Sequence, residues 1–371
     1  MSDYLTENKE RNKKGEFDKT DVLSVSGDYG VVNQIELLGR SFAGASVLPY
    51  HVVRHGNIVY TKSPLKEYPY GIVKANTGVD GIVSTLYAVY NIKNNVDAQF
   101  IEYYFSSANR TNRYFKPIVR IGAKHDMKIG NQEVLANKVT FPNLDEQTKI
   151  ASLFRFLDER IATQNKIIDK LQSLIKGISN KLLNSKEGML VRLGAILKER
   201  SEKTKKNNQY AVLSSTVNGL FSQRDYFSKD IASENNVGYK IIRLHDVVLS
   251  PQNLWMGNIN YNDKFDIGIV SPSYKVFLIS DDYDKRYVAA MLKTHRALYD
   301  YQLISEQGAS VVRRNLNLES FGQLVFRIPP LDKQREIGKT ISLLKSRLET
   351  ECMLKATYQS QKQYLLRQMF I

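Results

Sequence analysis

The sequence predicts an α+β protein that is built twice, with two mixed α/β domains separated by two long helices that pair as an antiparallel coiled coil. Two observations predict this fold: a heptad seam fills the middle of the chain, and the residues that open it return near the C-terminus. Strand-like segments of the first half also recur in the second. The predicted boundaries are a first domain at 1–141, a first helix at 142–186, a second domain at 187–328 and a second helix at 329–371.

The first long helix is predicted from its apolar periodicity. After Pro142 no glycine or proline occurs until Gly177, and Asp145 stands where it can cap the helix. Steps of four and three residues are the signature of a helix packed against another helix. The seam positions, of which only the glutamine is polar, are Ile150, Phe154, Leu157, Ile161, Gln164, Ile168, Leu171, Ile175, Ile178 and Leu182.

The second long helix repeats the opening of the first. Its first seam positions are apolar, the polar residues Glu351 and Lys355 interrupt them, and apolar spacing then resumes. We interpret this interruption as a stutter within one helix. Two unrelated surface helices are the alternative, but the shared lead-in sets the register twice. The seam does not determine the orientation of the pair, and antiparallel pairing is an inference. The matching lead-in residues are Pro142, Leu144, Asp145 and Gln147, which return as Pro329, Leu331, Asp332 and Gln334.

The two globular halves share strand-like segments and differ in their loops. Gly81–Ser84 recurs as Gly268–Ser271, and a predicted helix at 97–115 is answered by one at 284–298. The second half begins with a lead-in at 189–197 that has no match in the first, so we expect the first domain to lack an edge strand or to start late. Similar scaffolds with different loops suggest two readers of different targets.

Charge and cysteine content narrow the function classes. The 371 residues include 53 Lys and Arg against 38 Asp and Glu, a net charge of +15 that favours a polyanionic partner such as nucleic acid over an inert basic surface. The single cysteine, Cys352, excludes a disulfide framework and a multi-cysteine metal site. No signal peptide and no apolar run approaching about 18 residues is present, so we expect a cytoplasmic chain without a membrane partner.

The candidate DNA contacts are basic and amide side chains. Lysine and arginine neutralise phosphates, and Arg, Asn and Gln can hydrogen-bond base edges. The loop at 250–255 offers two amides beside an aromatic ring, and 61–63 is its counterpart. Any one of these residues taken alone is better explained as a turn residue or a solvated charge than as a base contact. The prediction of DNA binding therefore rests on the whole set. The predicted contacts are Lys62, Arg120, Lys124, Lys128, Arg224, Gln252, Asn253, Trp255, Arg313 and Arg314.

Catalytic motifs are missing from the sequence. No glycine-rich cofactor loop with an Asn/Asp-Pro-Pro-aromatic motif occurs, as a methyltransferase would need. The only fragment of a phosphate loop is Gly338-Lys339-Thr340, and Lys333 stands where the upstream glycine is required. The sequence therefore predicts a non-catalytic chain with no cofactor and no metal of its own.

The duplicated PNLDEQTKIASLFRFLDERI and PPLDKQREIGKTISLLKSRL, in the order domain, helix, domain, helix, resemble the specificity subunit (HsdS) of type I restriction-modification enzymes. The resemblance implies two target recognition domains, each reading one half of a split site in double-stranded DNA. It also implies that the helices act as a spacer and dock two methyltransferase (modification) subunits, with restriction/translocase subunits joining that core. S-adenosylmethionine, ATP and Mg²⁺ are expected to be used by those partners.

The partner-docking surface is predicted on the duplicated lead-ins, around Asp145, Gln147, Asp332 and Gln334, because identical partners that bind twice need a surface that occurs twice. Two other readings stay open. A coiled-coil adaptor with two protein-binding domains is disfavoured by the charge. A self-contained DNA methyltransferase or nuclease is disfavoured by the missing motifs.

Overall fold

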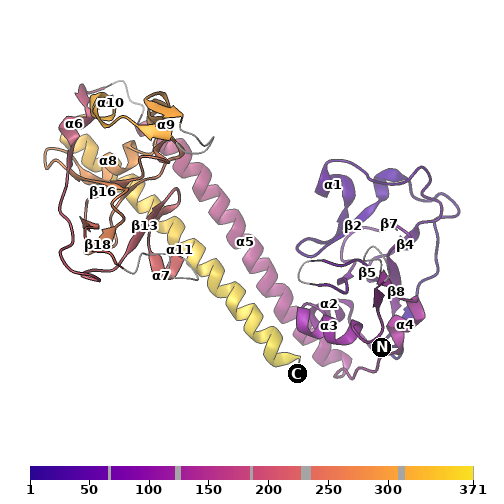
Figure 1. Ribbon diagram of the computed structural model, residues 1–371. Helices are drawn as coiled ribbons and strands as arrows, with labels where there is room; N and C mark the ends of the chain where they lie inside the picture. The colour runs from indigo at the N-terminus through magenta and orange to yellow at the C-terminus, as the bar shows by residue number, and fades with distance from the viewer. Residues whose placement is uncertain (66–67, 122–126, 184–186, 227–234, 308–313, 371) are drawn as a thin grey trace. The chain divides into compact units, whose positions relative to one another are not determined.

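The computed structural model describes residues 1–65, 68–121, 127–183, 187–226, 235–307 and 314–370 (Figure 1). The chain forms two compact units. Unit 1 comprises Met1–Asn165 and Leu354–Ile371, and unit 2 comprises Lys166–Met353. The two long helices, α5 (Leu144–Leu183) and α11 (Leu331–Met369), each contribute a part to both units. Both are unbroken, so the polar positions 351 and 355 lie within one helix, as predicted.

Unit 1 is organised around a four-stranded antiparallel sheet in the order β1-β8-β5-β6. These strands are β1 (Leu5–Glu7), β8 (Ala88–Ile92), β5 (Ile58–Tyr60) and β6 (Val73–Ala75). Two smaller pairs join β2 (Leu23–Ser26) to β3 (Gly30–Asn33) and β4 (His51–Val53) to β7 (Gly81–Val83). Every residue of β4, β5 and β7 is buried, which explains their continuous apolar runs.

The helices of unit 1 follow the sheet. They are α1 (Gln34–Leu38), α2 (Ala98–Tyr104), α3 (Ala108–Phe115) and α4 (Asn131–Ala136), with a 3-10 turn at Lys19–Asp21. The single helix predicted at 97–115 is therefore wrong. Two helices form, and the hydroxyl of Thr111 donates to the carbonyl oxygen of Phe105 at 2.6 Å, satisfying a backbone acceptor at the break.

An aromatic core joins the unit 1 domain to the helices. The rings of Tyr60 and Phe115 stack with centroids 4.4 Å apart, and Phe154 of α5 stacks on Phe370 at 5.8 Å. Arg160 of α5 donates from Nε to the hydroxyl of Tyr358 in α11 at 2.8 Å. Partners further along α5 lie earlier in α11, so the helices are antiparallel within unit 1, as predicted.

Unit 2 repeats the architecture with a sheet in the order β12-β19-β16-β17. Its strands are β12 (Leu197–Glu199), β19 (Lys275–Ile279), β16 (Val247–Leu249) and β17 (Ile259–Tyr261). The small pairs also recur, joining β13 (Leu213–Thr216) to β14 (Gly219–Ser222) and β15 (Lys240–Arg243) to β18 (Ile267–Val270). The predicted internal repeat is confirmed by this shared strand order.

The lead-in that is special to the second half forms β11 (Met189–Arg192), which pairs with β22 (Val325–Ile328) in a separate two-stranded sheet. It is not the edge of the four-stranded sheet. That edge is β12 in unit 2 and β1 in unit 1, and both pair with the corresponding neighbour. The expectation that the first domain lacks an edge strand is therefore wrong for its main sheet.

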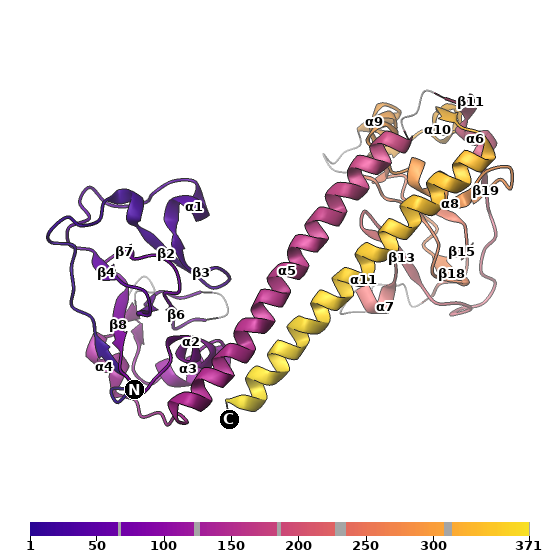
Figure 2. The ribbon, with the colours of Figure 1, turned by 180° about the vertical axis from the view of Figure 1, so that it is seen from behind.

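The helices of unit 2 are α6 (Leu193–Ile196), α7 (Gln223–Tyr226), α8 (Lys285–Met291), α9 (His295–Leu303) and α10 (Leu318–Gln323), with a 3-10 turn, η3, at Leu254–Met256. The helix predicted at 284–298 is likewise two helices, α8 and α9. Leu182 and Leu183 at the end of α5 pack in one core with Ile337 and Ile341 near the start of α11. Figure 2 shows α8 beside α11 in this unit.

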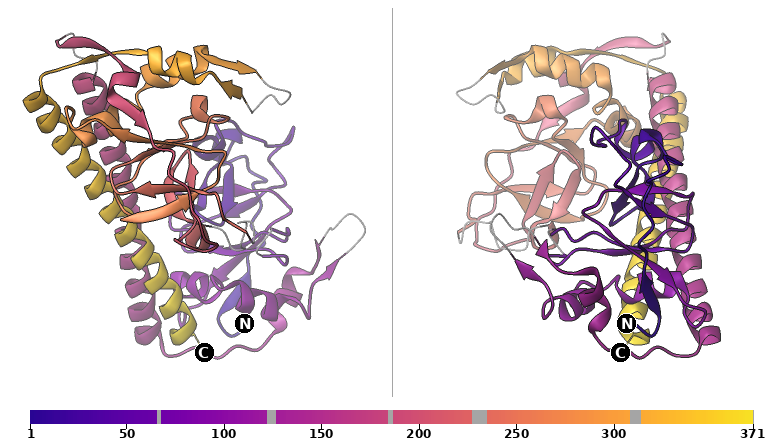
Figure 3. Two further views of the ribbon diagram at one scale, coloured as in Figure 1. Left: turned by 60° about the vertical axis from the view of Figure 1, so that its left-hand side comes forward. Right: turned by 90° about the vertical axis from the view of Figure 1, so that its right-hand side faces the viewer.

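A hairpin arm extends from the body of each domain (Figure 3). In unit 1 it is formed by β9 (Arg120–Ile121) and β10 (Met127–Lys128), and in unit 2 by β20 (Ser305–Gln307) and β21 (Arg314–Leu316). In the part of the chain that the structure describes, no helix is both long and apolar enough to cross a membrane.

Candidate nucleic-acid interface

The unit 1 arm carries two of the predicted basic residues. Arg120 and Lys128 are direct partners across the antiparallel ladder, so both side chains leave the same face of the hairpin. Lys128 is exposed, and the side chain of Arg120 is 79% exposed while contacting Glu133 at 3.0 Å. Such a solvated ion pair is weak and leaves the guanidinium open to a phosphate. Lys124 lies outside the described residues.

The unit 2 arm brings three predicted residues together. The Arg314 guanidinium carbon lies 5.1 Å from the ring centroid of Trp255, and the Arg314 backbone N–H donates to the carbonyl oxygen of Gln252 at 3.1 Å. Arg314 Nη1 also donates to the carbonyl oxygens of Gln302 and Ser305 at 3.3 and 3.4 Å. Arg314 therefore ties the arm to the loop that precedes η3. Arg313 lies outside the described residues.

The two amides of that loop differ in exposure. Gln252 is exposed, whereas Asn253 is half-buried and its carbonyl oxygen accepts from the backbone N–H groups of Met256 and Asn258. Gln252 thus presents a donor and an acceptor to solvent, next to the partly buried ring of Trp255. An amide beside an aromatic ring is suited to a nucleobase, by hydrogen bonding and by ring contact.

The remaining predicted contacts are divided between free and occupied cations. Arg224 on α7 is exposed. Lys62 is half-buried at a positive φ of 46°, donates from Nζ to Asn131 Oδ1, and has a pKa lowered chiefly by burial. It joins the end of β5 to α4. Arg110 of α3, which is not one of the predicted contacts, lies over the rings of Tyr104 and Phe370 at 5.1 and 5.3 Å, so it belongs to the packing of unit 1.

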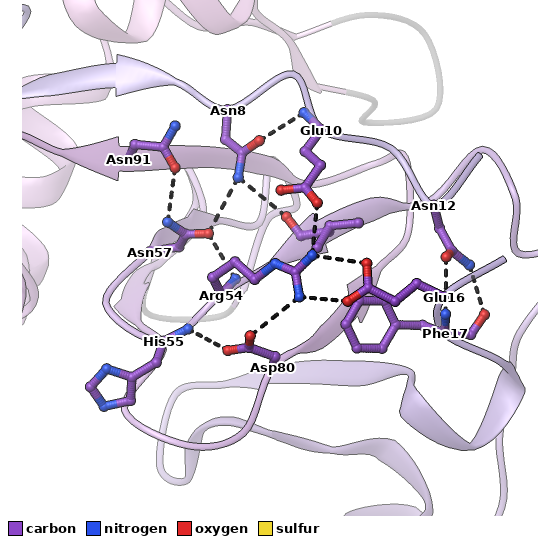
Figure 4. A network of polar contacts seen from close by, with 11 residues as sticks. Asn8, Glu10, Asn12, Glu16, Phe17, Arg54, His55, Asn57, Asp80 and Asn91 are labelled. Atoms are coloured by element: carbon purple, nitrogen blue, oxygen red, sulfur yellow. Dashed lines mark hydrogen bonds and ion pairs between the residues drawn. The ribbon is translucent and has the colours of Figure 1, made fainter. Parts of the chain in front are cut away.

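A partly exposed network of ion pairs neutralises another arginine of unit 1, Arg54. Arg54 contacts Glu10 at 2.8 Å, Glu16 at 2.8 Å and Asp80 at 3.4 Å, and hydrogen bonds to the two glutamates raise its pKa (Figure 4). Arg243 and Glu202 make the corresponding contact in unit 2 at 2.9 Å. These ion pairs link separate segments of each domain, and carboxylates already neutralise the charge of both arginines.

Two of the four predicted docking residues prove to be buried. Gln147 accepts at Oε1 from the backbone N–H of Asp97 at 3.1 Å and donates from Nε2 to the carbonyl oxygens of Asn95 and Pro142 at 3.1 and 2.8 Å. Gln147 has 0% and Gln334 3% of its surface exposed, so neither side chain is available to a partner. Their assignment to a docking surface is wrong.

The repeated glutamine is instead a latch between each domain and its long helix. Gln334 accepts at Oε1 from the N–H of Asp284 at 3.0 Å and donates from Nε2 to the carbonyl oxygen of Pro329 at 2.9 Å. Asp97 and Asp284 are the N-caps of α2 and α8. We call these hydrogen bonds of Gln147 and Gln334 the glutamine latches. The duplicated lead-in is thus explained by domain packing.

Asp145 and Asp332 are exposed, as a docking surface requires. A second duplicated pair, which the heptad pattern does not reveal, lies on the same helices: Phe156 and Leu343 are 57% and 61% exposed. They occupy equivalent positions, each one residue before Leu157 or Leu344 of the repeated motif. Aligning the two helix sequences places these two apolar residues at the same position. The heptad pattern does not mark them, because they lie outside the seam.

Comparison with known proteins supplies a likeness in structure alone. No family model and no curated protein sequence matches the chain. A crystal structure of the type I restriction-modification system S subunit from M. genitalium aligns over 99% of this chain and 94% of its own, with a TM-score of 0.58 at 12% identity. A chain from a study of complex assembly and conformational transition of the type I restriction-modification system aligns over 99% and 95%, with a TM-score of 0.52 at 12% identity. The fold implied by the sequence resemblance is confirmed.

Proposed function

We propose that this chain is the specificity subunit of a type I restriction-modification complex, which reads a bipartite DNA site and directs methyltransferase and endonuclease subunits to it. One observation carries the proposal: the same sheet and helix scaffold is built twice, with different side chains on its loops and arms. The fold shared with S subunits and the net charge of +15 support it.

The two domains then read different half-sites. Unit 1 offers the cations Arg120 and Lys128 on its arm, which suit backbone phosphates. Unit 2 offers Gln252 beside Trp255 and Arg314, a group that can contact base edges. Phosphate contacts position a protein on DNA and base contacts specify the sequence, so different residues at matching places give different targets.

Partner docking is assigned to the exposed duplicated positions of the helices. Phe156 and Leu343 supply apolar contact, and Asp145 and Asp332 supply charge. Because each feature occurs once per repeat, the surface suits two copies of one modification subunit. Methyl transfer and DNA cleavage would belong to the partners, which would use S-adenosylmethionine, ATP and Mg²⁺, and the chain itself would be non-catalytic.

The test compares methylated adenines in the host genome with and without this gene. We expect one split motif to disappear when the gene is removed and to return when it is restored. In parallel, the purified full chain should shift duplex DNA in a salt-dependent manner. An unchanged methylation pattern together with no DNA binding would reject the proposal, and DNA-independent capture of protein partners alone would favour an adaptor.

A further inference from the structure

Unit 2 contains a cleft of about 600 Å³ lined by α8, the first half of α11, the β13–β14 hairpin, and the end of β17 with the loop that follows it. Its lining is rich in amides and cations. Lys264, Arg286, Lys293 and Lys345 line it against two carboxylates, Asp263 and Glu349. One of those carboxylates is already occupied, since Lys264 and Glu349 form an ion pair at 3.0 Å. The cleft therefore carries a net positive charge.

Lys293 and Lys345 of the cleft form no ion pair with the residues that the structure describes. Lys293 is half-buried and donates from Nζ to Asn260 Oδ1 at 2.6 Å and to the carbonyl oxygen of Val217 at 3.4 Å, both neutral acceptors. Its pKa is lowered to about 8, mainly by burial and further by the charge of Lys345. Within the described ranges, Lys345 makes no hydrogen bond and no ion pair; burial lowers its pKa, and the charges of Asp263 and Glu349 offset part of that effect. Like charges held together in a partly desolvated cleft repel each other, which is unfavourable unless an anion binds there.

The first repeat shows that the fold does not require this charge. The position in α5 that corresponds to Lys345 is Asp158, one residue after Leu157 of the repeated motif. Asp158 accepts a hydrogen bond from the Tyr103 hydroxyl at 2.9 Å and pairs with Lys362. The charge at the equivalent place in unit 1 is thus neutralised by an ion pair, whereas Lys293 and Lys345 of unit 2 form none with the described residues.

We propose that the cleft lined by Lys293, Lys345 and Arg286 is a phosphate-binding site of unit 2. A phosphate oxygen accepts from ammonium and guanidinium donors and would relieve the repulsion between the two lysines. Asn218 and Asn262 also line the cleft and add neutral hydrogen-bonding groups at its edge. The phosphate can come from a DNA backbone, an assignment that rests on the proposed function, or from a small phosphate compound. The experiment separates these sources.

The first arm uses pyrophosphate and the full-length chain, without DNA. Calorimetry at pH 7 should show binding by the wild type, weakened at least about tenfold in Lys293→Met and in Lys345→Gln, as expected for a charged hydrogen bond. Lys293→Arg should retain it. Lys339→Gln is the matched control, because Lys339 is exposed on the same helix outside the cleft. Lys345 is itself exposed, so its variant should fold.

The pH profile gives a second readout. Phosphate binds the protonated lysine, and the pKa of Lys293 is lowered to about 8, so affinity should fall roughly fivefold between pH 8 and pH 9. The other charged side chains that line the cleft are Lys264, Arg286, Lys345, Asp263 and Glu349. The Lys293→Arg variant should lose this pH dependence while keeping its affinity. Binding that is independent of pH in the wild type would count against the lysine as the ligand.

The second arm measures DNA affinity against salt. Each neutralised phosphate contributes about −0.9 to the slope of log affinity against log salt concentration, so Lys345→Gln should reduce the slope by about one unit if DNA occupies the cleft. An unchanged slope with lost pyrophosphate binding assigns the cleft to a small phosphate compound. Absence of pyrophosphate binding together with an unchanged slope overturns the proposal. A wild type that binds pyrophosphate but no DNA rejects the proposed function and leaves the phosphate site standing.

Discussion

Replacing Gln334 by alanine tests whether the glutamine latch holds the second domain to its helix. The change removes two hydrogen bonds and strands the N–H of Asp284 and the carbonyl oxygen of Pro329 in a site where the glutamine is 3% exposed. Each lost bond costs about 0.5–1.5 kcal/mol, and buried groups left unsatisfied add more, so we expect a loss of about 2–4 kcal/mol in the free energy of unfolding of unit 2.

The assay is urea unfolding of the full chain together with hydrogen exchange. Exchange should quicken at the start of α8, because the Asp284 amide loses its acceptor. Asp332→Ala is the matched control from the same lead-in, is exposed, and should change stability by less than about 0.5 kcal/mol. Gln147→Ala should do the same in unit 1, against Asp145→Ala. Equal stability of Gln334→Ala and Asp332→Ala would refute the latch.

Three further outcomes are expected. Gly338→Ala should destabilise unit 2 by about 1–3 kcal/mol in thermal unfolding, because the added Cβ would lie 2.4 Å from Asp284 Oδ1 and 2.7 Å from the Tyr287 backbone nitrogen. Ala151, the equivalent residue in unit 1, is the control position. An unchanged melting temperature would contradict this close approach. Phe156→Asp and Leu343→Asp should each weaken binding of a modification subunit in pull-down and sedimentation assays while leaving DNA affinity intact. Tyr364→Asp, at an exposed position of α11, is the control. Unchanged assembly in the Phe156→Asp, Leu343→Asp double variant would rule out this docking surface. Exchanging 189–327 for the matching domain of a related protein should alter one half of the methylated motif, and simultaneous change in both halves would contradict the modular reading.

The sequence by itself determined the repeat and the two long helices, and its net charge favours a polyanionic partner. Heptad periodicity and the twice-written lead-in are local patterns that survive without knowledge of contacts, and net charge needs no structure at all. The antiparallel pairing was inferred correctly, although only contacts such as Arg160 with Tyr358 establish it within unit 1. Local patterns did not predict the break between α2 and α3, where the Thr111 side chain, and not a continuing helix, satisfies the carbonyl oxygen of Phe105.

Tertiary structure alone decided what the conspicuous side chains do. Gln147 and Gln334 stand in a polar motif at the start of a helix, which suggests exposure. The domain nevertheless covers them, and their side-chain amides hydrogen-bond to its backbone. The sequence does not show that Arg54 and Arg110 have partners. In the fold, Arg54 forms ion pairs and Arg110 packs on aromatic rings. Lys293 and Lys345 lie far apart in the chain and become neighbours only because α8 packs against α11. Burial and pairing depend on residues distant in sequence, so periodicity and composition cannot supply them.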